Sequence, residues 1–327
     1  MSRFAGVDEI GKAGYARGCE VVRELSPLGI TTPDGFTVTV DAYQEFIRST
    51  SLRPFIAGQL RRYRHGADLL AVGAAIRTAF AYAEMPAGLA RAITTAYREL
   101  GGDGTPLVVR SGAAPFVDRQ EIFFNVRTSR ELLAACKRCF AILFAGRAIL
   151  LREKCGLDQL AAAMFVKVQR MGESELPASG TVEVLDNRSP RLVRVKAIWG
   201  LGDPANSAAV NPDEYVILDG LSACTLVARR RGTKETKVVC AGSRGVRTVP
   251  TGPDERCRHV LTDVEALVLA DWAATMESLY GGRPLTIDWA KDGPAGDLAV
   301  VGVRPAPAGW RGIPFSAGVN GTAVPAN

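Results

Sequence analysis

Histidine is scarce in this sequence: the 327 residues include only two, His65 and His259. His65 ends the arginine-rich stretch Arg61–His65, and His259 follows Arg256-Cys-Arg. Neither has a second metal-binding side chain at ligand spacing, and the sequence contains no Gly-x-Ser-x-Gly nucleophile motif. We interpret both histidines as partly solvated surface or interface residues.

Long apolar runs are also missing, since none reaches the ~18–20 residues that a membrane-spanning helix needs. The acidic residues Asp8 and Glu9 stand where a signal peptide would be apolar. We therefore expect a cytoplasmic protein without a membrane partner.

The seven cysteines are odd in number and scattered, which disfavours a disulfide framework and favours reduced thiols. Cys136 and Cys139 form a Cys-x-x-Cys motif, but they share helical spacing with Leu132, Leu133 and Phe140. No second such motif completes a zinc site. The pair is therefore predicted to lie in a helix and to face the core as small apolar side chains.

Composition indicates a globular chain, with 47% hydrophobic and 23% charged residues. The length allows one large bilobed domain or two packed domains. Forty Lys and Arg against 34 Asp and Glu leave a net charge of +6, spread over the whole chain. That excess suits anionic small molecules such as nucleotides and is too dilute to indicate nucleic acid.

Hydrophobic periodicity predicts a mixed α/β protein without internal repeats. Asp41 is expected to cap a helix that follows it. We expect helices over 14–29, 67–100 (broken near Met85-Pro86), 129–154, 157–162 and 261–281. We expect strands over 36–40, 106–110, 163–170, 179–186, 191–199, 214–218, 285–289 and 298–303, with β-like sequence over 220–251.

Three charged residues stand where packing alone does not explain them. Arg110 ends an apolar strand and precedes Ser111-Gly112, a position that favours a cleft. Asp288 lies on one strand of the last hairpin and Arg304 ends the other, so the two are held near each other. From the residues alone, this is either a structural ion pair or a metal-plus-phosphate site.

Several segments occur in the order of a known family. These are Gly11-Lys12, Leu25–Phe36, Leu107-Val-Val-Arg-Ser111, Glu121–Val126, Val168-Gln-Arg-Met171, Trp199-Gly-Leu-Gly202, Ala209–Glu214, Arg283–Gly293 and Val303-Arg-Pro305. Together they resemble the ATP-binding part of phosphoenolpyruvate synthase and pyruvate phosphate dikinase, over roughly residues 8–306. The resemblance implies an α/β (α+β), bilobed ATP-grasp-like fold over residues 1–310. Its lobes would cover roughly 1–190 and 191–310, followed by a loose tail over 311–327.

The resemblance also implies a site for ATP and Mg²⁺. Lys12, Arg110, Gln169, Asp288 and Arg304 match the family's nucleotide-binding positions, with Arg110 and Arg304 on the phosphates in the catalytic role. Asp288 stands for the family's metal-binding glutamate.

Two features depart from the family pattern. The family's second metal ligand, a glutamine, is Gly302 here. The loop over 113–122 is shorter than the family's phosphate-binding loop, and Ile122 replaces its threonine.

In the family, a phosphohistidine domain follows the ATP-binding part, and neither histidine here sits in such a motif. The chain therefore resembles the ATP-binding subunit of a split phosphotransferase. Its partner would be a separate phosphohistidine subunit that passes the phosphoryl group to a small acceptor, either phenol, as in phenylphosphate synthase, or pyruvate. The alternative is a degenerate, non-catalytic subunit that binds and regulates the phosphohistidine partner.

Overall fold

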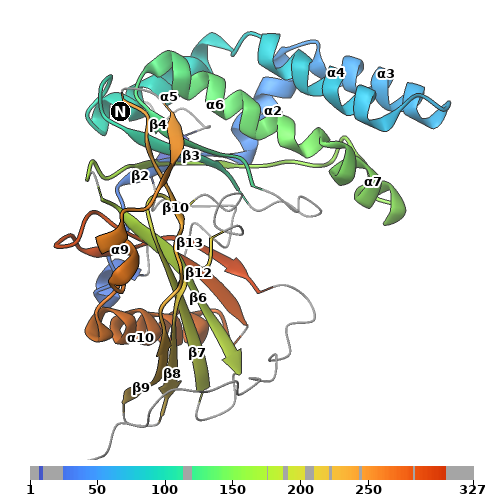
Figure 1. The fold of residues 1–327 in the computed structure, drawn as a ribbon. Helices are drawn as coiled ribbons and strands as arrows, with labels where there is room; N and C mark the ends of the chain where they lie inside the picture. Colours follow the sequence, from blue (N-terminus) through green and yellow to red (C-terminus); the bar gives the residue numbers. More distant parts are fainter. Residues whose placement is uncertain are drawn as a thin grey trace, which may run out of the picture.

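A computed structural model describes residues 7–9, 25–112, 120–174, 176–186, 191–202, 210–220, 223–242, 245–282 and 284–306. Over this part, the chain forms two lobes, each built on an antiparallel sheet (Figure 1). Lys12, most of the helix predicted over 14–29 and the tail over 311–327 lie outside the described residues.

The first lobe has a five-stranded sheet in the order β1-β2-β5-β3-β4. Its strands are β1 (Val7–Glu9), β2 (Gly35–Val38), β3 (Leu107–Ser111), β4 (Ile122–Val126) and β5 (Val166–Arg170). Its helices are α2 (Val40–Ser49), α3 (Leu52–Arg64), α4 (Leu69–Tyr82), α5 (Ala87–Glu99), α6 (Ser129–Ala141) and α7 (Gly146–Lys154). Apolar side chains of alternate strand residues pack with the helices in one core, as Val166, Val168, Phe46 and Phe140 do.

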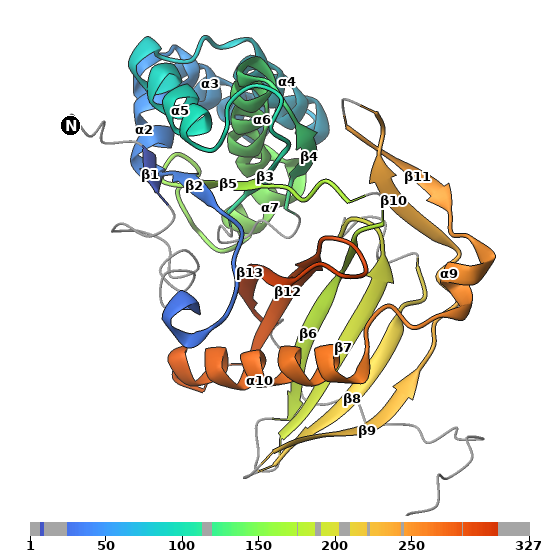
Figure 2. The same cartoon turned by 90° about the vertical axis from the view of Figure 1, so that its left-hand side faces the viewer.

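The second lobe has a six-stranded sheet in the order β13-β12-β6-β7-β8-β9. Its strands are β6 (Ala178–Asp186), β7 (Arg191–Trp199), β8 (Asp213–Asp219), β9 (Cys224–Arg230), β12 (Leu285–Lys291) and β13 (Leu298–Pro305). Helix α10 (Asp263–Leu279) packs on one face of this sheet through Ala266, Leu269 and Ala273 (Figure 2). A separate hairpin, β10 (Thr236–Cys240) and β11 (Val246–Pro250), leads into the short α9 (Pro253–Cys257).

Three predicted helix features are wrong in detail. The cap of α2 is Thr39, whose hydroxyl accepts from the Ala42 amide, and Asp41 lies in the first turn. The 129–154 helix is interrupted by a 3₁₀ turn, η2 (Ile142–Phe144), and Arg152 satisfies a carbonyl freed there, that of Leu143. Residues 157–162 are turns rather than a helix, because the Asp158 carboxylate accepts from the Leu160 amide and competes with helical hydrogen bonding.

The chain passes from one sheet to the other between Arg170 and Ala178, earlier than the lobe boundary expected near residue 190, because β6 pairs with β7 and β12. The N-terminal side of the chain also contributes to both lobes. The 3₁₀ turn η1 (Ser26–Leu28) is flanked by Leu25 and Ile30, which are buried in the core of the second lobe. The Val300 amide of β13 donates to the Thr31 carbonyl at 2.9 Å.

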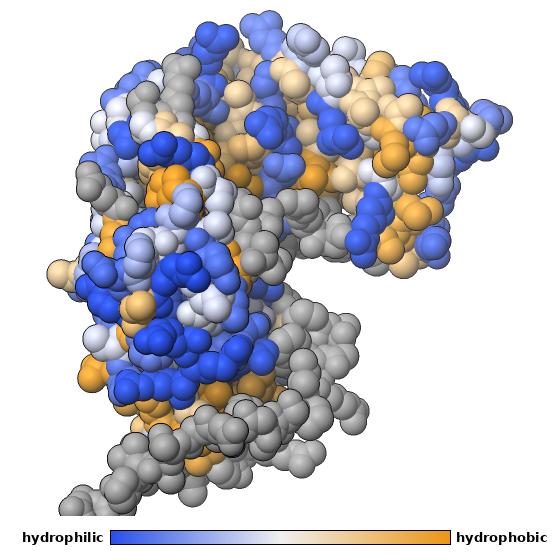
Figure 3. Space-filling model, in the orientation of Figure 1, coloured by the Kyte–Doolittle hydropathy of each residue, from blue (hydrophilic) through white to orange (hydrophobic). Residues whose placement is uncertain are grey.

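The mixed α/β fold class is confirmed. In the space-filling view, hydrophilic and hydrophobic residues are mixed over this face of both lobes (Figure 3). None of the helices in the described ranges is long and apolar enough to cross a membrane.

Candidate functional site

The face of the five-stranded sheet that points away from its helices carries polar side chains. In the sheet register, Arg110 of β3 is opposite Lys167 of β5, and Val108 is opposite Gln169. Since Val109 and Val168 belong to the helix-covered core, Arg110, Lys167 and Gln169 lie on the other face. This face points toward the β12–β13 hairpin of the second lobe (Figure 2).

The β12–β13 hairpin also has a polar face. Ile287 and Trp289 of β12 are buried in the core of the second lobe, so Asp288 between them faces the opposite way. Asp288 is paired with Gly302 across the hairpin, and a β-bulge follows this pair. Arg304 donates from Nη2 to Asp288 Oδ1 at 3.2 Å. The predicted proximity of Asp288 and Arg304 is therefore confirmed.

The two polar faces meet at Gly302. A Cβ placed on this glycine would lie 3.0 Å from Asp288 Oδ2 and 3.3 Å from Arg110 Nη1. Next to it, Lys167 Nζ donates to the Val301 carbonyl at 3.3 Å. The structure thus brings Arg110 of the first lobe together with Asp288 of the second, from positions far apart in the sequence.

Polar atoms of Arg110 and Gln169 on this sheet face have no hydrogen-bond partner among the described residues. Gln169 is 1% exposed, and neither atom of its side-chain amide has a hydrogen bond. The Arg110 Nε atom is buried without an acceptor. Burial lowers the pKa of the Arg110 guanidinium, and the charge of Asp288 opposes that shift. Because buried polar groups are nearly always hydrogen-bonded, these atoms indicate a site that is completed by a ligand.

Lys167 is the residue that sequence reasoning missed. It is 5% exposed, on the same face as Arg110 and Gln169. The signal was available in the strand Val166-Lys-Val-Gln169, where two polar residues alternate with two valines. Lys167 alternates with core valines, and the neighbouring strand carries Arg110. The lysine therefore adds a second positive charge to the sheet face on which Arg110 lies.

The residues present do not fit a protein-held Mg²⁺. Asp288 is the single carboxylate at the expected metal positions, one of its oxygens accepts from Arg304, and Gly302 offers no side-chain ligand. In the described ranges, no group of three or more His, Cys, Asp or Glu side chains could hold a metal ion. Mg²⁺ prefers six oxygen ligands, and two guanidinium groups beside the carboxylate repel a further cation.

The Trp199-Gly-Leu-Gly202 segment has a structural role. Gly200 has a φ of 93°, and a Cβ there would lie 2.5 Å from the Val238 carbonyl oxygen of β10. The Trp199 indole donates to the Glu255 carbonyl at 2.8 Å, and the Leu201 amide donates to Val238 at 2.9 Å. This segment fastens the β10–β11 hairpin to the sheet.

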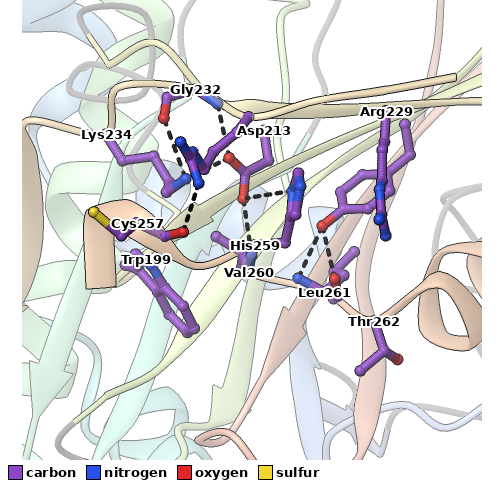
Figure 4. A network of polar contacts seen from close by, with 12 residues as sticks. Trp199, Asp213, Arg229, Gly232, Lys234, Cys257, His259, Val260, Leu261 and Thr262 are labelled. Atoms are coloured by element: carbon purple, nitrogen blue, oxygen red, sulfur yellow. Dashed lines mark hydrogen bonds and ion pairs between the residues drawn. The ribbon is translucent and has the colours of Figure 1, made fainter. Parts of the chain in front are cut away.

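The histidines and the Cys-x-x-Cys motif lie where we expected. His65 is exposed at the end of α3. His259 is partly exposed, with Nδ1 3.8 Å from an oxygen of the buried Asp213 (Figure 4). Cys136 and Cys139 are buried core residues of α6, and burial raises the pKa of Cys136 to about 12.

The fold thus brings Arg110 of the first lobe together with Asp288 and Arg304 of the second, and the unpartnered amide of Gln169 lies on the same sheet face as Arg110. The chain matches the family described as the pyruvate phosphate dikinase AMP/ATP-binding domain over residues 16–310, and it belongs to that family. It is 32% identical to phosphoenolpyruvate synthase of Synechocystis sp., 35% identical to that of Pseudomonas aeruginosa and 33% identical to that of Escherichia coli. These matches cover 92%, 91% and 91% of this chain, respectively, but only 40% of each relative.

Proposed function

We propose that this chain is the ATP-binding component of a phosphotransferase of the phosphoenolpyruvate synthase type. It would use ATP to phosphorylate a histidine on a separate partner subunit, in the cytoplasm. The observation that carries the proposal is the convergence of Arg110, Gln169, Asp288 and Arg304 at the junction of two lobes, in a chain of an ATP-binding family.

The arginines would serve the phosphates. A guanidinium presents several N–H donors and binds phosphate oxygens in pairs, so Arg110 and Arg304 would neutralise charge on the polyphosphate from either side. The buried side-chain amide of Gln169 would form hydrogen bonds with the nucleotide. Lys12, outside the described residues, is the further phosphate contact that the family resemblance supplies.

A transfer histidine would come from elsewhere. The two histidines of the chain lie at the end of α3 and beside Asp213, away from the Arg110–Asp288–Arg304 group. The relatives are about two and a half times as long as the matched part. In this proposal, a partner subunit carries the phosphohistidine and hands the phosphoryl group to phenol or to pyruvate.

The second candidate is a non-catalytic subunit that regulates this partner. It is favoured by Gly302, which leaves Asp288 without a second metal ligand, and by the Arg304 contact of Asp288.

Label transfer tests the proposal and separates the two candidates. The purified chain is incubated with ATP radiolabelled in its phosphates, alone and together with the phosphohistidine-domain chain of its own genome. We expect acid-labile, base-stable label on the partner only when both chains are present, and no phosphorylated product from this chain alone. Label that never appears although ATP binds would favour the regulatory candidate. A chain that binds no ATP would overturn the catalytic proposal and also favour the regulatory candidate.

A further inference from the structure

Gly302 has no side chain, and charged atoms of Asp288 and Arg110 lie close to the place that a side chain would take. Asp288 Oδ2 and Arg110 Nη1 both lie within 3.3 Å of the point that a Cβ at position 302 would take. Such distances are at or below the tight end of ordinary contacts, so any side chain at this position presses on the carboxylate and on the guanidinium. The absence of a side chain is therefore what lets Arg110 approach Asp288.

The charges around this point do not balance. Asp288 contributes one negative charge, Arg110 and Arg304 contribute two positive charges, and Lys167 beside Val301 contributes a third. Adding Mg²⁺ would raise this positive excess further, beside a single carboxylate. Adding a polyphosphate anion would neutralise it, and in a partly buried site this difference is weakly screened.

The donors without partners point to the same ligand class. Gln169 is 1% exposed with its side-chain nitrogen unbonded, and the Arg110 Nε is buried and unbonded. A hydrated Mg²⁺ ion cannot accept hydrogen bonds from such N–H groups, whereas phosphate oxygens can accept several.

We propose that the Arg110–Asp288–Arg304 group holds the polyphosphate of the nucleotide directly, so that nucleotide binding does not require a divalent cation. In this arrangement Asp288 is a positioning residue: it orients the Arg304 guanidinium and offsets part of the repulsion between the two arginines. The inference rests on the proposed function only in taking ATP as the ligand.

Calorimetry on the unmodified chain tests the inference. ATP is titrated in excess EDTA and, separately, in excess Mg²⁺. We expect dissociation constants that differ by less than about threefold, and we expect sodium tripolyphosphate to displace ATP in EDTA. Binding that appears only with Mg²⁺, or that weakens more than about tenfold in EDTA, overturns this inference and leaves the proposed function standing. A chain that binds ATP in neither buffer overturns both.

A glycine substitution adds a test of the geometry. Gly302→Ala places a methyl group against Asp288 and Arg110, so ATP binding in EDTA is expected to weaken by about tenfold. The matched control is Gly58→Ala in α3, where the added methyl group would lie 3.9 Å from its nearest neighbour, an Arg61 nitrogen, and where no change in ATP affinity is expected. Equal affinity of the Gly302→Ala chain and the parent would show that Arg110 does not need this space.

Discussion

Two carboxylates of the six-stranded sheet lie beside cations, and they differ in how many of their hydrogen bonds the protein supplies. Asp213 at the start of β8 is fully buried and is bonded by Lys234 and by the Gly232 and Val260 amides, each amide at 2.8 Å (Figure 4). Asp288 on β12 is partly exposed and accepts one hydrogen bond, from Arg304 at 3.2 Å. The protein itself supplies the hydrogen-bond partners of the Asp213 group, which we call the complete group. The Asp288 group, which we call the incomplete group, has donors without a partner.

This difference separates a structural ion pair from the proposed binding site within one sheet. Asp213 belongs to the Ala209–Glu214 segment on which part of the family resemblance rests. Its contacts tie β8 to the segments around Gly232 and Val260, so that motif is explained by folding. A buried pair whose members are both satisfied has nothing to offer a nucleotide, whereas unpartnered arginine and glutamine atoms do.

The largest expected effect comes from breaking the complete group. Lys234→Met leaves the Asp213 charge buried without its cation, which is expected to lower the free energy of unfolding by about 3–5 kcal/mol. Urea denaturation followed by circular dichroism measures this. The control is Arg230→Met, which removes an exposed pair with Glu214 and is expected to cost less than about 1 kcal/mol. If the two variants are equally stable, Asp213 and Lys234 do not form the stabilising unit that we describe.

The next effect concerns the incomplete group. Arg304→Met removes one charge-assisted phosphate contact, worth about 1.5–3 kcal/mol, so ATP affinity is expected to fall by about tenfold or more. Stability is expected to change little, because Arg304 is partly exposed and makes a single pair with Asp288. Calorimetry with ATP measures the affinity, and Arg229→Met, which breaks the exposed pair with Asp263, is the matched control. An Arg304→Met chain that binds ATP as the parent does would remove Arg304 from the site.

The smallest effect is a pH dependence at the complete group. Burial lowers the pKa of His259 from its ordinary value of 6.5, the nearby Asp213 opposes the shift, and Arg229, Lys234 and Arg231 reinforce it. The folded state therefore binds this proton less well than the unfolded state. Stability from this residue is complete above about pH 6.5 and is lost as the pH falls toward the lower folded pKa.

The comparison with a neutral side chain isolates this contribution. Between about pH 7.5 and pH 5.5, His259→Gln is expected to lose less stability than the parent. Urea denaturation of both chains at the two pH values gives the difference. An identical pH dependence in the two chains would contradict the pKa shift.

Local sequence pattern predicted the parts of the fold whose partners are near in sequence. The last hairpin was predicted almost to its ends, because alternating apolar residues flank a turn rich in glycine and proline, and this also placed Asp288 beside Arg304. Arg110 was singled out because a charge at the end of an apolar strand is rare in a core.

Long-range pairing accounts for what sequence reasoning missed. The strand over 179–186 was predicted, but its membership in the second sheet depends on β12, about 100 residues later. The alternation in Val166–Gln169 puts Lys167 and Gln169 on one face of their strand, but the neighbours that make Lys167 part of the site, Arg110 in the sheet and Val301 across the lobes, come from long-range pairing. Thr39 and Asp41 are both good capping residues, and local preference alone does not choose between them.

The hydrogen bond between Val300 and Thr31 joins residues that are made at very different times. About 270 residues separate them, so a ribosome adding roughly 5–20 residues per second needs some tens of seconds to deliver the partner of Thr31. Leu25 and Ile30, which are buried in the same second-lobe core, have no part of that core to pack against until β6 has been made, and the core is complete only with β13. The earliest described segment of the second lobe thus stays exposed while much of the chain is made, and its apolar side chains are then open to binding by a chaperone.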